Sequence, residues 1–544
     1  MRGTARSYNA PLVFFSSAVL VLLLFGGSFR ALAAATAPSP TGHPAAREVH
    51  NPVIWEDLAD LDIFRVGDVY YYSASNMHYS PGAPILRSYD LVHWQYVGHS
   101  VPVLDFGPGY NLGDGRRAYV RGTWASFLGY RKANKTFYWG GCVDFKKTYI
   151  YTASAVQGPW HRHAVLPECY YDAGLLIDTD NTMYVAWGNT TLHVSQLSPN
   201  ATHQVKTQVV FHAPPNVKVL EGSRFYKVHG DYYIFTDHPP DSEYVLKSTH
   251  GPFGPYKIRP LVVRAVPPVA GAGSPHQGGI VETQRGDWYY MAFIDAYPGG
   301  RVPVLAPMTW DSHGWPHLHL KNNQWPVTVA YPLPPHPLPP LTGTDHFRGT
   351  KLSPQWEWNH NPDNAKYSVH NGLTLQTATV TDDLFQARNT LTHRILGPES
   401  TATVVLNDSA MKNGDRAGLA LFRNSSAWVG VERDNGKYLV VMEDNIRLGK
   451  GWKTVSTGTE VASHPIAPGR IWLRATADIH PGAGRKGYFF WSTDGHTFHP
   501  IGTPFTMDNS WPFFMGYRYA IFNYATKSLG GDVKVASFTM TRPR

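Results

Sequence analysis

The chain has 544 residues, which is enough for two or three domains. Its formal net charge is +8, and its Lys and Arg residues are spread along the chain without runs. This pattern argues against a nucleic-acid partner. Beyond the N-terminus no segment is apolar enough to span a membrane, and we expect a monomer.

The N-terminus has the pattern of a secretory signal peptide. Arg2 and Arg6 precede a mostly apolar run of 14 residues, Leu12–Phe25, and Ala31–Ala33 offers a small-x-small cleavage site. We therefore predict a signal peptide at 1–33 and a secreted, extracellular protein; the alternative is an uncleaved membrane anchor. Five sequons are candidates for glycosylation: Asn134, Asn189, Asn200, Asn407 and Asn424.

Five short aromatic stretches recur in the first two thirds of the chain, each a polar turn that runs into an aromatic strand. They are Gly67–Tyr71, Asn134–Tyr138, Asp180–Tyr184, His229–Tyr233 and Gly286–Tyr290. Their last tyrosines are 67, 46, 49 and 57 residues apart, which is about the period of propeller blades. The spacing predicts an all-β chain with a five-bladed β-propeller over 50–328.

Polar and aromatic residues precede these stretches at a nearly constant distance. Asp60, Asp172, Glu221, Trp124 and His276 lie 11, 12, 12, 14 and 14 residues before the final tyrosines. That distance is one strand plus one turn, so each residue is predicted on the innermost strand of its blade. Inner strands line one channel, where the five side chains would converge.

Two Asp and one Glu around a channel suit hydrolysis of a glycosidic bond. One carboxyl group must donate a proton while another activates water, and a third can hold up the pKa of the donor. The longer Glu221 is predicted to be the acid; spacing leaves the roles of Asp60 and Asp172 open. Asp62, on the same predicted strand face, rivals Asp60, and acids in propellers also cap turns or bind structural ions.

Three further residues are candidates for binding. Trp124 could stack on a sugar or pack a blade, and Arg301 could bind a hydroxyl or brace a carboxylate. His276 could hold a central cation or a water, or be a satisfied core group.

Cys142 and Cys169 are the two cysteines of the chain. In an exported protein a pair indicates one disulfide, and the alternative is two buried thiols.

A proline-rich segment divides the chain. We predict a stiff linker over 329–344 and, from regularly spaced short strands, a β-sandwich over 345–544. The sandwich could bind polysaccharide or brace the propeller and shape its cleft; the short linker favours bracing.

These motifs resemble glycoside hydrolase family 43. Asn51–Trp55, Ala59–Tyr71, Gly122–Ser126, Glu221–Tyr226 and Pro275–Thr283 carry the likeness. The C-terminal part resembles the concanavalin-like sandwich behind some members, through Asn359–Asp363, Ala387–Thr392 and Gly414–Ala420.

The resemblance implies a propeller that hydrolyses with inversion. It makes Asp60 the general base, Asp172 the pKa modulator and Glu221 the general acid. It places His276 at the propeller centre, near a calcium ion or a water, and Arg301 near the substrate. No cofactor is required, and a structural calcium is an option.

Departures at flanking positions narrow the resemblance. Leu61, Ser223 and Ala173–Gly174 stand where many members have proline or Pro-Ser. The pattern looks closest to fungal arabinoxylan arabinofuranohydrolases, some of which act on doubly substituted xylose. We therefore expect an exo-acting α-L-arabinofuranosidase on arabinoxylan or a related hemicellulose. The alternatives are a β-xylosidase acting on xylo-oligosaccharides and, from another class, a non-catalytic carbohydrate-binding protein.

Overall fold

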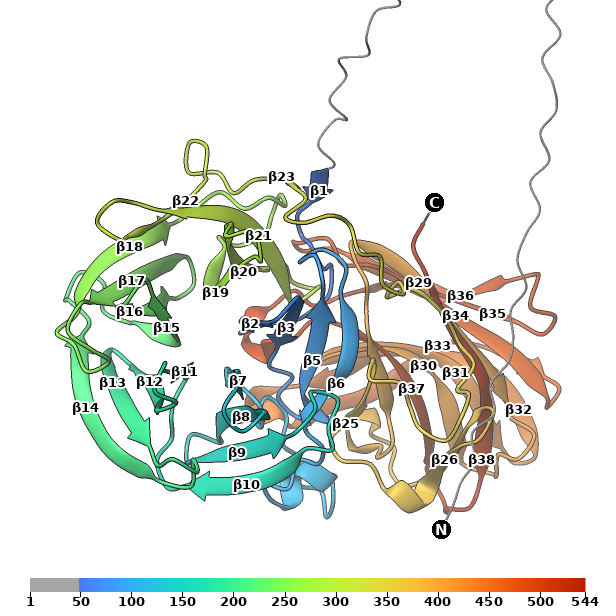
Figure 1. Ribbon diagram of the computed structural model, residues 1–544. Coiled ribbons are helices and arrows are strands. Elements are labelled where there is room, and N and C mark those ends of the chain that lie inside the picture. The colour runs from blue at the N-terminus through green and yellow to red at the C-terminus, as the bar shows by residue number, and fades with distance from the viewer. Residues whose placement is uncertain (1–47, 544) are drawn as a thin grey trace, which may run out of the picture. The chain divides into compact units, whose positions relative to one another are not determined.

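The computed structural model describes residues 48–543 (Figure 1). The predicted signal peptide lies outside this range. Within it, the helices are short 3-10 turns, and none is long and apolar enough to cross a membrane. They are η1 (Pro108–Asn111), η2 (Asn364–Lys366), η3 (Leu384–Gln386), η4 (Lys450–Trp452) and η5 (Trp511–Phe513).

Five four-stranded antiparallel sheets form a propeller, as predicted (Figure 1). Blade 1 contains β2 (Asp62–Val66), β3 (Val69–Ser73), β5 (Gly82–Ser88) and β6 (Gln95–Val101). Blade 2 contains β7 (Phe127–Arg131), β8 (Thr136–Val143), β9 (Lys147–Ala153) and β10 (His161–Leu166). Blade 3 contains β11 (Gly174–Ile177), β12 (Met183–Asn189), β13 (Thr191–Leu197) and β14 (Gln204–His212). Blade 4 contains β15 (Glu221–Val228), β16 (Asp231–His238), β17 (Ser242–Ser248) and β18 (Lys257–Val263). Blade 5 contains β19 (His276–Glu282), β20 (Trp288–Asp295), β21 (Arg301–Trp310) and β22 (Pro316–Leu318).

The five aromatic stretches supply the second strand of each blade. In β3, for example, Tyr70 and Tyr72 are fully buried while Tyr71 between them is not, which is the alternation of a strand. The turn before it uses Gly67 at φ +61°, a conformation that glycine adopts without strain. The strand that precedes each aromatic strand in sequence pairs with it as the first strand of the blade.

The segments that precede and follow the five blades pair with each other. β1 (Glu48–His50) pairs with β23 (Thr328–Ala330), and the amide nitrogen of Asn51 donates to the carbonyl oxygen of Leu305 at 2.9 Å. The proline-rich segment that follows lies against blade 1, where the backbone N–H of His336 donates to Asp90 Oδ2 at 2.7 Å.

Two eight-stranded sheets form the C-terminal sandwich. The first sheet contains β24 (Gly343–Asp345), β26 (Tyr367–Val369), β27 (Leu373–Gln376), β29 (Glu399–Asn407), β34 (Arg470–Asp478), β35 (Lys486–Ser492), β36 (His499–Thr506) and β38 (Asp532–Thr541). The second contains β25 (Trp356–Asn359), β28 (Leu391–Arg394), β30 (Asp415–Phe422), β31 (Ser425–Asp434), β32 (Lys437–Leu448), β33 (Thr454–Ile466), β37 (Arg518–Ala525) and β4 (Tyr79–Ser80). Alternate residues of these strands, such as Val404, Leu419 and Leu473, are fully buried in the core between the sheets.

The propeller and the sandwich share a sheet and a buried ion cluster. β4 comes from blade 1 and pairs with β25 of the sandwich. Next to it, Glu357 accepts hydrogen bonds from Arg394 at 2.9 Å and from Arg518. Burial raises the pKa of Glu357, but these two guanidinium groups hold that pKa well below its usual range. His99 of the propeller lies 3.0 Å from the same carboxylate, so the cluster joins the domains.

Candidate active site

A cavity of about 890 Å³ opens where the inner strands begin. All six predicted catalytic and binding residues line it: Asp60, Trp124, Asp172, Glu221, His276 and Arg301. Residues that are distant in sequence therefore meet at one end of the propeller, and a cavity of this size suits a small organic ligand.

The prediction that these residues lie on the innermost strands holds for Glu221 and His276 but not for Asp60, Asp172 and Trp124, which lie just before such strands. Glu221 and His276 are the first residues of β15 and β19, whereas Asp60 and Asp172 precede β2 and β11. The backbone explains the difference, because Asp60 and Asp172 have φ of 55° and 48°. This left-handed conformation interrupts the extended backbone just before each of these two strands, and aspartate tolerates it better than most residues.

Asp60 is held as a hydrogen-bond acceptor. Its Oδ1 accepts from Nη1 of Arg301, and its Oδ2 accepts from the hydroxyl of Ser75 at 2.6 Å. The side chain of Asp60 is only 4% exposed, so the paired guanidinium compensates a buried charge.

Asp172 and Glu221 lie in surroundings that favour protonation. Burial, followed by the charges of Glu221 and Asp60, raises the pKa of Asp172 well above its usual range. Burial and the charge of Asp237 raise the pKa of Glu221. The hydroxyl of Tyr171 donates to Glu221 Oε2 at 3.1 Å and opposes that rise. The cavity thus holds one arginine-paired carboxyl beside two that tend to keep a proton.

His276 lies between two further carboxylates. Its Nδ1 is 3.1 Å from Asp237 Oδ1, and its Nε2 is 3.6 Å from Asp295 Oδ2. Burial alone would lower the pKa of His276, but these two charges raise it to about 10. The presence of a calcium ion or a water beside His276 stays a prediction.

Arg224, on β15 beside Glu221, organises the backbone around the acids. Its guanidinium donates to the carbonyl oxygens of Asp60 at 2.8 Å, Leu61 at 2.7 Å and Ala173 at 2.9 Å. The side chain is 1% exposed. One buried cation thus connects blade 4 with the segments that carry Asp60 and, through Ala173, Asp172.

Aromatic rings from both domains wall the cavity. Trp124 and Phe145 come from blade 2, and Trp511 and Phe514 come from the sandwich. The rings of Trp124 and Phe514 are 4.9 Å apart, and Phe514 also lies 4.9 Å from the guanidinium carbon of Arg301. The sandwich therefore contributes directly to the wall of the cavity.

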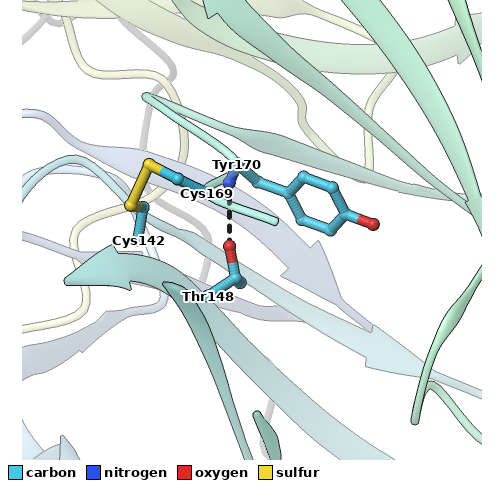
Figure 2. The surroundings of a disulfide bond; sticks show 4 residues. All are labelled: Cys142, Thr148, Cys169 and Tyr170. Carbon is cyan, nitrogen blue, oxygen red and sulfur yellow. Dashed lines mark hydrogen bonds between the residues drawn. A yellow bond between two sulfur atoms is a disulfide. The ribbon is translucent and has the colours of Figure 1, made fainter. Parts of the chain in front are cut away.

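The two cysteines form a disulfide between blades 2 and 3 (Figure 2). Cys142 lies near the end of β8, and Cys169 precedes β11, with their Cα atoms 5.0 Å apart. The backbone N–H of Tyr170 donates to Thr148 Oγ1 at 2.8 Å beside the bridge (Figure 2). Both contacts restrain the segment that leads to Asp172.

The five sequons differ in their surroundings. Asn134, Asn200 and Asn407 are exposed, and so is Asn189. The amide nitrogen of Asn189, however, donates to Glu221 Oε2. Asn424 is partly buried and donates to Asp508, and the amide nitrogen of Asn134 donates to the hydroxyl of Tyr138 at 2.8 Å, so three of the five amide nitrogens already have partners.

The structure adds residues that the sequence interpretation missed. Asp237 and Asp295 line the cavity, four and five residues after the tyrosines of their aromatic stretches. Counting forward as well as backward from those tyrosines would have found them. Asp62 does not line the cavity; its Oδ2 accepts from the backbone N–H of Leu128 at 2.9 Å and joins blades 1 and 2.

A propeller whose axis gathers carboxyl groups, an arginine and aromatic walls in one cavity has the features of a glycosidase. Comparison with known proteins agrees. The chain matches Glycosyl hydrolases family 43 over residues 49–316 and the Beta xylosidase C-terminal Concanavalin A-like domain over residues 344–541. The chain belongs to glycosyl hydrolase family 43 and is a glycoside hydrolase with a C-terminal concanavalin-like domain.

Its relatives carry more than one activity. A solved family 43 glycoside hydrolase, engineered to display both endo-xylanase and exo-arabinofuranosidase activity, is 47% identical, with a TM-score of 0.89 over 92% of this chain and 100% of that one. A Beta-xylosidase of Formosa agariphila is 28% identical over 90% of this chain and 89% of its own length. A non-reducing end alpha-L-arabinofuranosidase of Bacteroides ovatus is 27% identical over 60% of this chain and 64% of its own length.

Proposed function

We propose that this glycoside hydrolase is an inverting, exo-acting α-L-arabinofuranosidase that removes side chains from arabinoxylan. The observation that carries the chemistry is the contrast between Asp60, paired with Arg301, and Glu221, whose pKa is raised. One carboxyl group suits a base and the other an acid. The choice of arabinose rests on the flanking motifs and on the 47% identical relative with exo-arabinofuranosidase activity.

In the proposed mechanism, Asp60 accepts a proton from the water that attacks the anomeric carbon. Glu221 protonates the departing xylose oxygen, and Asp172 helps keep that proton on Glu221 before the reaction. Inversion calls for a base and an acid roughly 6.5–9.5 Å apart, so that the water fits between base and sugar. The reaction uses only water and these groups, and we propose no required cofactor.

A β-xylosidase is the second candidate, and a specific observation favours it. The relative from Formosa agariphila, which aligns over 90% of this chain, is a Beta-xylosidase. The same acid and base could serve either sugar, because the sugar is selected by the cavity wall.

For the arabinofuranosidase, doubly substituted xylose units of arabinoxylan remain part of the proposed substrate.

We also propose that the protein is secreted, acts as a monomer on hemicellulose, and carries glycans at some exposed sequons. The N-terminal pattern, a disulfide and the exposed Asn134, Asn200 and Asn407 support this. Mass spectrometry of protein from a eukaryotic host would test the cleavage at Ala33 and the glycans.

Proton NMR of the purified protein acting on soluble arabinoxylan tests the activity. We expect free arabinose that appears first as the β-anomer. Release of xylose with little arabinose would replace the proposal with the β-xylosidase. Xylo-oligosaccharides with singly substituted xylose and others with doubly substituted xylose, used as separate substrates, would show which branch is cut.

A Glu221→Gln variant tests the role of the acid. We expect kcat to fall by about 10²- to 10⁴-fold, because the amide cannot donate the proton, while oligosaccharide binding is kept. Isothermal titration with a non-hydrolysed oligosaccharide measures the binding. Full activity in this variant would contradict the assignment, and binding by an inactive wild type would favour a carbohydrate-binding protein.

A further inference from the structure

The turn between β12 and β13 contacts the segments that carry two of the proposed catalytic acids. The backbone N–H of Gly188 donates to the carbonyl oxygen of Tyr171 at 3.0 Å, directly before Asp172. The backbone N–H of Thr190 donates to the carbonyl oxygen of Leu220 at 3.2 Å, directly before Glu221. This three-residue turn therefore joins blade 3 to the start of blade 4.

Glycine is required at the first position of the turn. Gly188 has φ +129°, and a Cβ there would lie 2.2 Å from the carbonyl oxygen of Thr191. Thr190 has φ +67°, so the residues on both sides of Asn189 adopt conformations that side chains disfavour. Such a tight turn sets the direction in which the side chain between them points.

That side chain is Asn189, and its orientation is set from both ends. The hydroxyl of Thr190 donates to Asn189 Oδ1 at 2.9 Å, which identifies the amide oxygen. The amide nitrogen then faces Glu221 and donates to Oε2, the oxygen that also accepts from Tyr171. Because both donors meet at Oε2, the acidic proton of Glu221 is left on Oε1.

We propose that Asn189 is a positioning residue, which holds the carboxyl group of Glu221 so that Oε1 presents its proton to the leaving group. The inference rests on the proposed function, because it matters only if Glu221 is the acid. Glutamate has three rotatable side-chain bonds, and Tyr171 alone would fix one contact of the carboxyl group. The amide from the turn supplies the second.

The same contact bears on modification. Asn189, Thr190 and Thr191 form a sequon, yet a glycan on the amide nitrogen would stand beside Glu221. We therefore expect this sequon to stay unmodified in active protein, whereas Asn134 remains accessible.

Two substitutions at Asn189 test the positioning role. Asn189→Asp keeps the shape but loses the donor, and Asn189→Ala removes the group. We expect kcat to fall by about tenfold in Asn189→Ala, the fold-change of a lost hydrogen bond to a charged group. The donor favours the ionised form of Glu221, so its loss leaves Glu221 protonated to higher pH. The alkaline limb of kcat/KM should move upward, and further upward in Asn189→Asp, which adds a like charge.

Thr191→Val is the matched control, because it removes the sequon and keeps both Asn189 and a β-branched residue in β13. We expect its kcat, pH profile and melting temperature to equal those of the wild type. Peptide mapping of wild-type protein from a glycosylating host should find Asn189 unmodified. A glycan on Asn189 in fully active enzyme would overturn the inference.

The outcomes separate this inference from the proposed function. If the wild type releases no sugar, the proposed function fails. If the wild type is active and Glu221→Gln is not, but the Asn189 variants keep the wild-type kcat and alkaline limb, the positioning role alone fails. Lower melting temperatures with an unmoved alkaline limb would likewise reduce Asn189 to a structural residue.

Discussion

Glu56 is a buried carboxyl group at the boundary of blade 1 and the sandwich. It is 1% exposed, and its Oε2 accepts a hydrogen bond from the hydroxyl of Tyr96 at 2.6 Å. The ring of Tyr96 packs against Arg394 of the sandwich. Burial is the dominant influence on Glu56 and raises its pKa from 4.5 to about 7. The folded protein therefore favours neutral Glu56 at a pH where the unfolded chain ionises it.

The sign of this shift gives a prediction about stability. An acid whose pKa is raised by folding contributes stability below its unfolded pKa, and that contribution is lost as pH rises from 4.5 to about 7. Glu56→Gln removes the titration, so relative to the wild type the variant should gain about 3 kcal/mol over this interval. Denaturation curves from pH 4.5 to 7.5 measure it. Exposed Glu48→Gln is the control, and a pH-independent difference between wild type and Glu56→Gln would contradict the prediction.

At the scale of elements, the inner strands bring the acids together through backbone contacts as much as through side chains. Arg224 is the main example, because its guanidinium reaches carbonyl oxygens on the segments before β2 and β11. These carbonyl groups are buried and would lose their partner without it. A buried group left unpaired costs about 1–3 kcal/mol.

Arg224→Met should therefore destabilise the protein by about 3–5 kcal/mol and lower kcat more than it raises KM. The reason is that Asp60 and Asp172 lose their backbone support while the cavity wall stays. Arg65→Met is a matched control, because Arg65 also bonds a carbonyl oxygen between blades, that of Glu282 at 2.7 Å, but on β2 away from the cavity. It should lower the melting temperature and spare kcat. Equal losses of kcat in both variants would show that Arg224 acts through stability alone.

The strands and turns also show which features of the fold and the site could be predicted from the sequence. The repeated aromatic strands are local signals, and counting back one strand and one turn found Asp60, Asp172 and Glu221 without any contact information. Asn189 was missed as a partner of Glu221, because a turn in one blade carries no local sign of the strand it faces in the next. The left-handed backbone at Asp60 and Asp172 was missed for a similar reason, since tertiary contacts impose it.

At the scale of the whole molecule, hydrogen bonds near the cavity hold the sandwich against the propeller. The carboxylate of Asp57 accepts from the backbone N–H of Arg301 and from that of Gly516 in the sandwich, both at 2.9 Å. Gly300 and Gly516 permit this approach, because a Cβ on Gly516 would lie 2.3 Å from the carbonyl oxygen of Gly299. Nothing local in the sequence links residues near 516 to those near 57, so this contact could not be predicted from it.

Trp511 of the sandwich lines the cavity. A substitution at this residue tests whether the sandwich contacts the substrate or only supports the propeller. Trp511 lines the cavity yet is 62% exposed, so the fold does not depend on its side chain. Trp511→Ala should leave the melting temperature unchanged and raise KM for arabinoxylan by about five- to thirty-fold, which corresponds to about 1–2 kcal/mol of ring contact. Tyr488→Ala, at a ring that is 44% exposed on β35, is the control and should leave KM unchanged. An unaltered KM in Trp511→Ala would show that this ring does not contact the substrate and would leave Phe514 as the sandwich ring at the cavity wall.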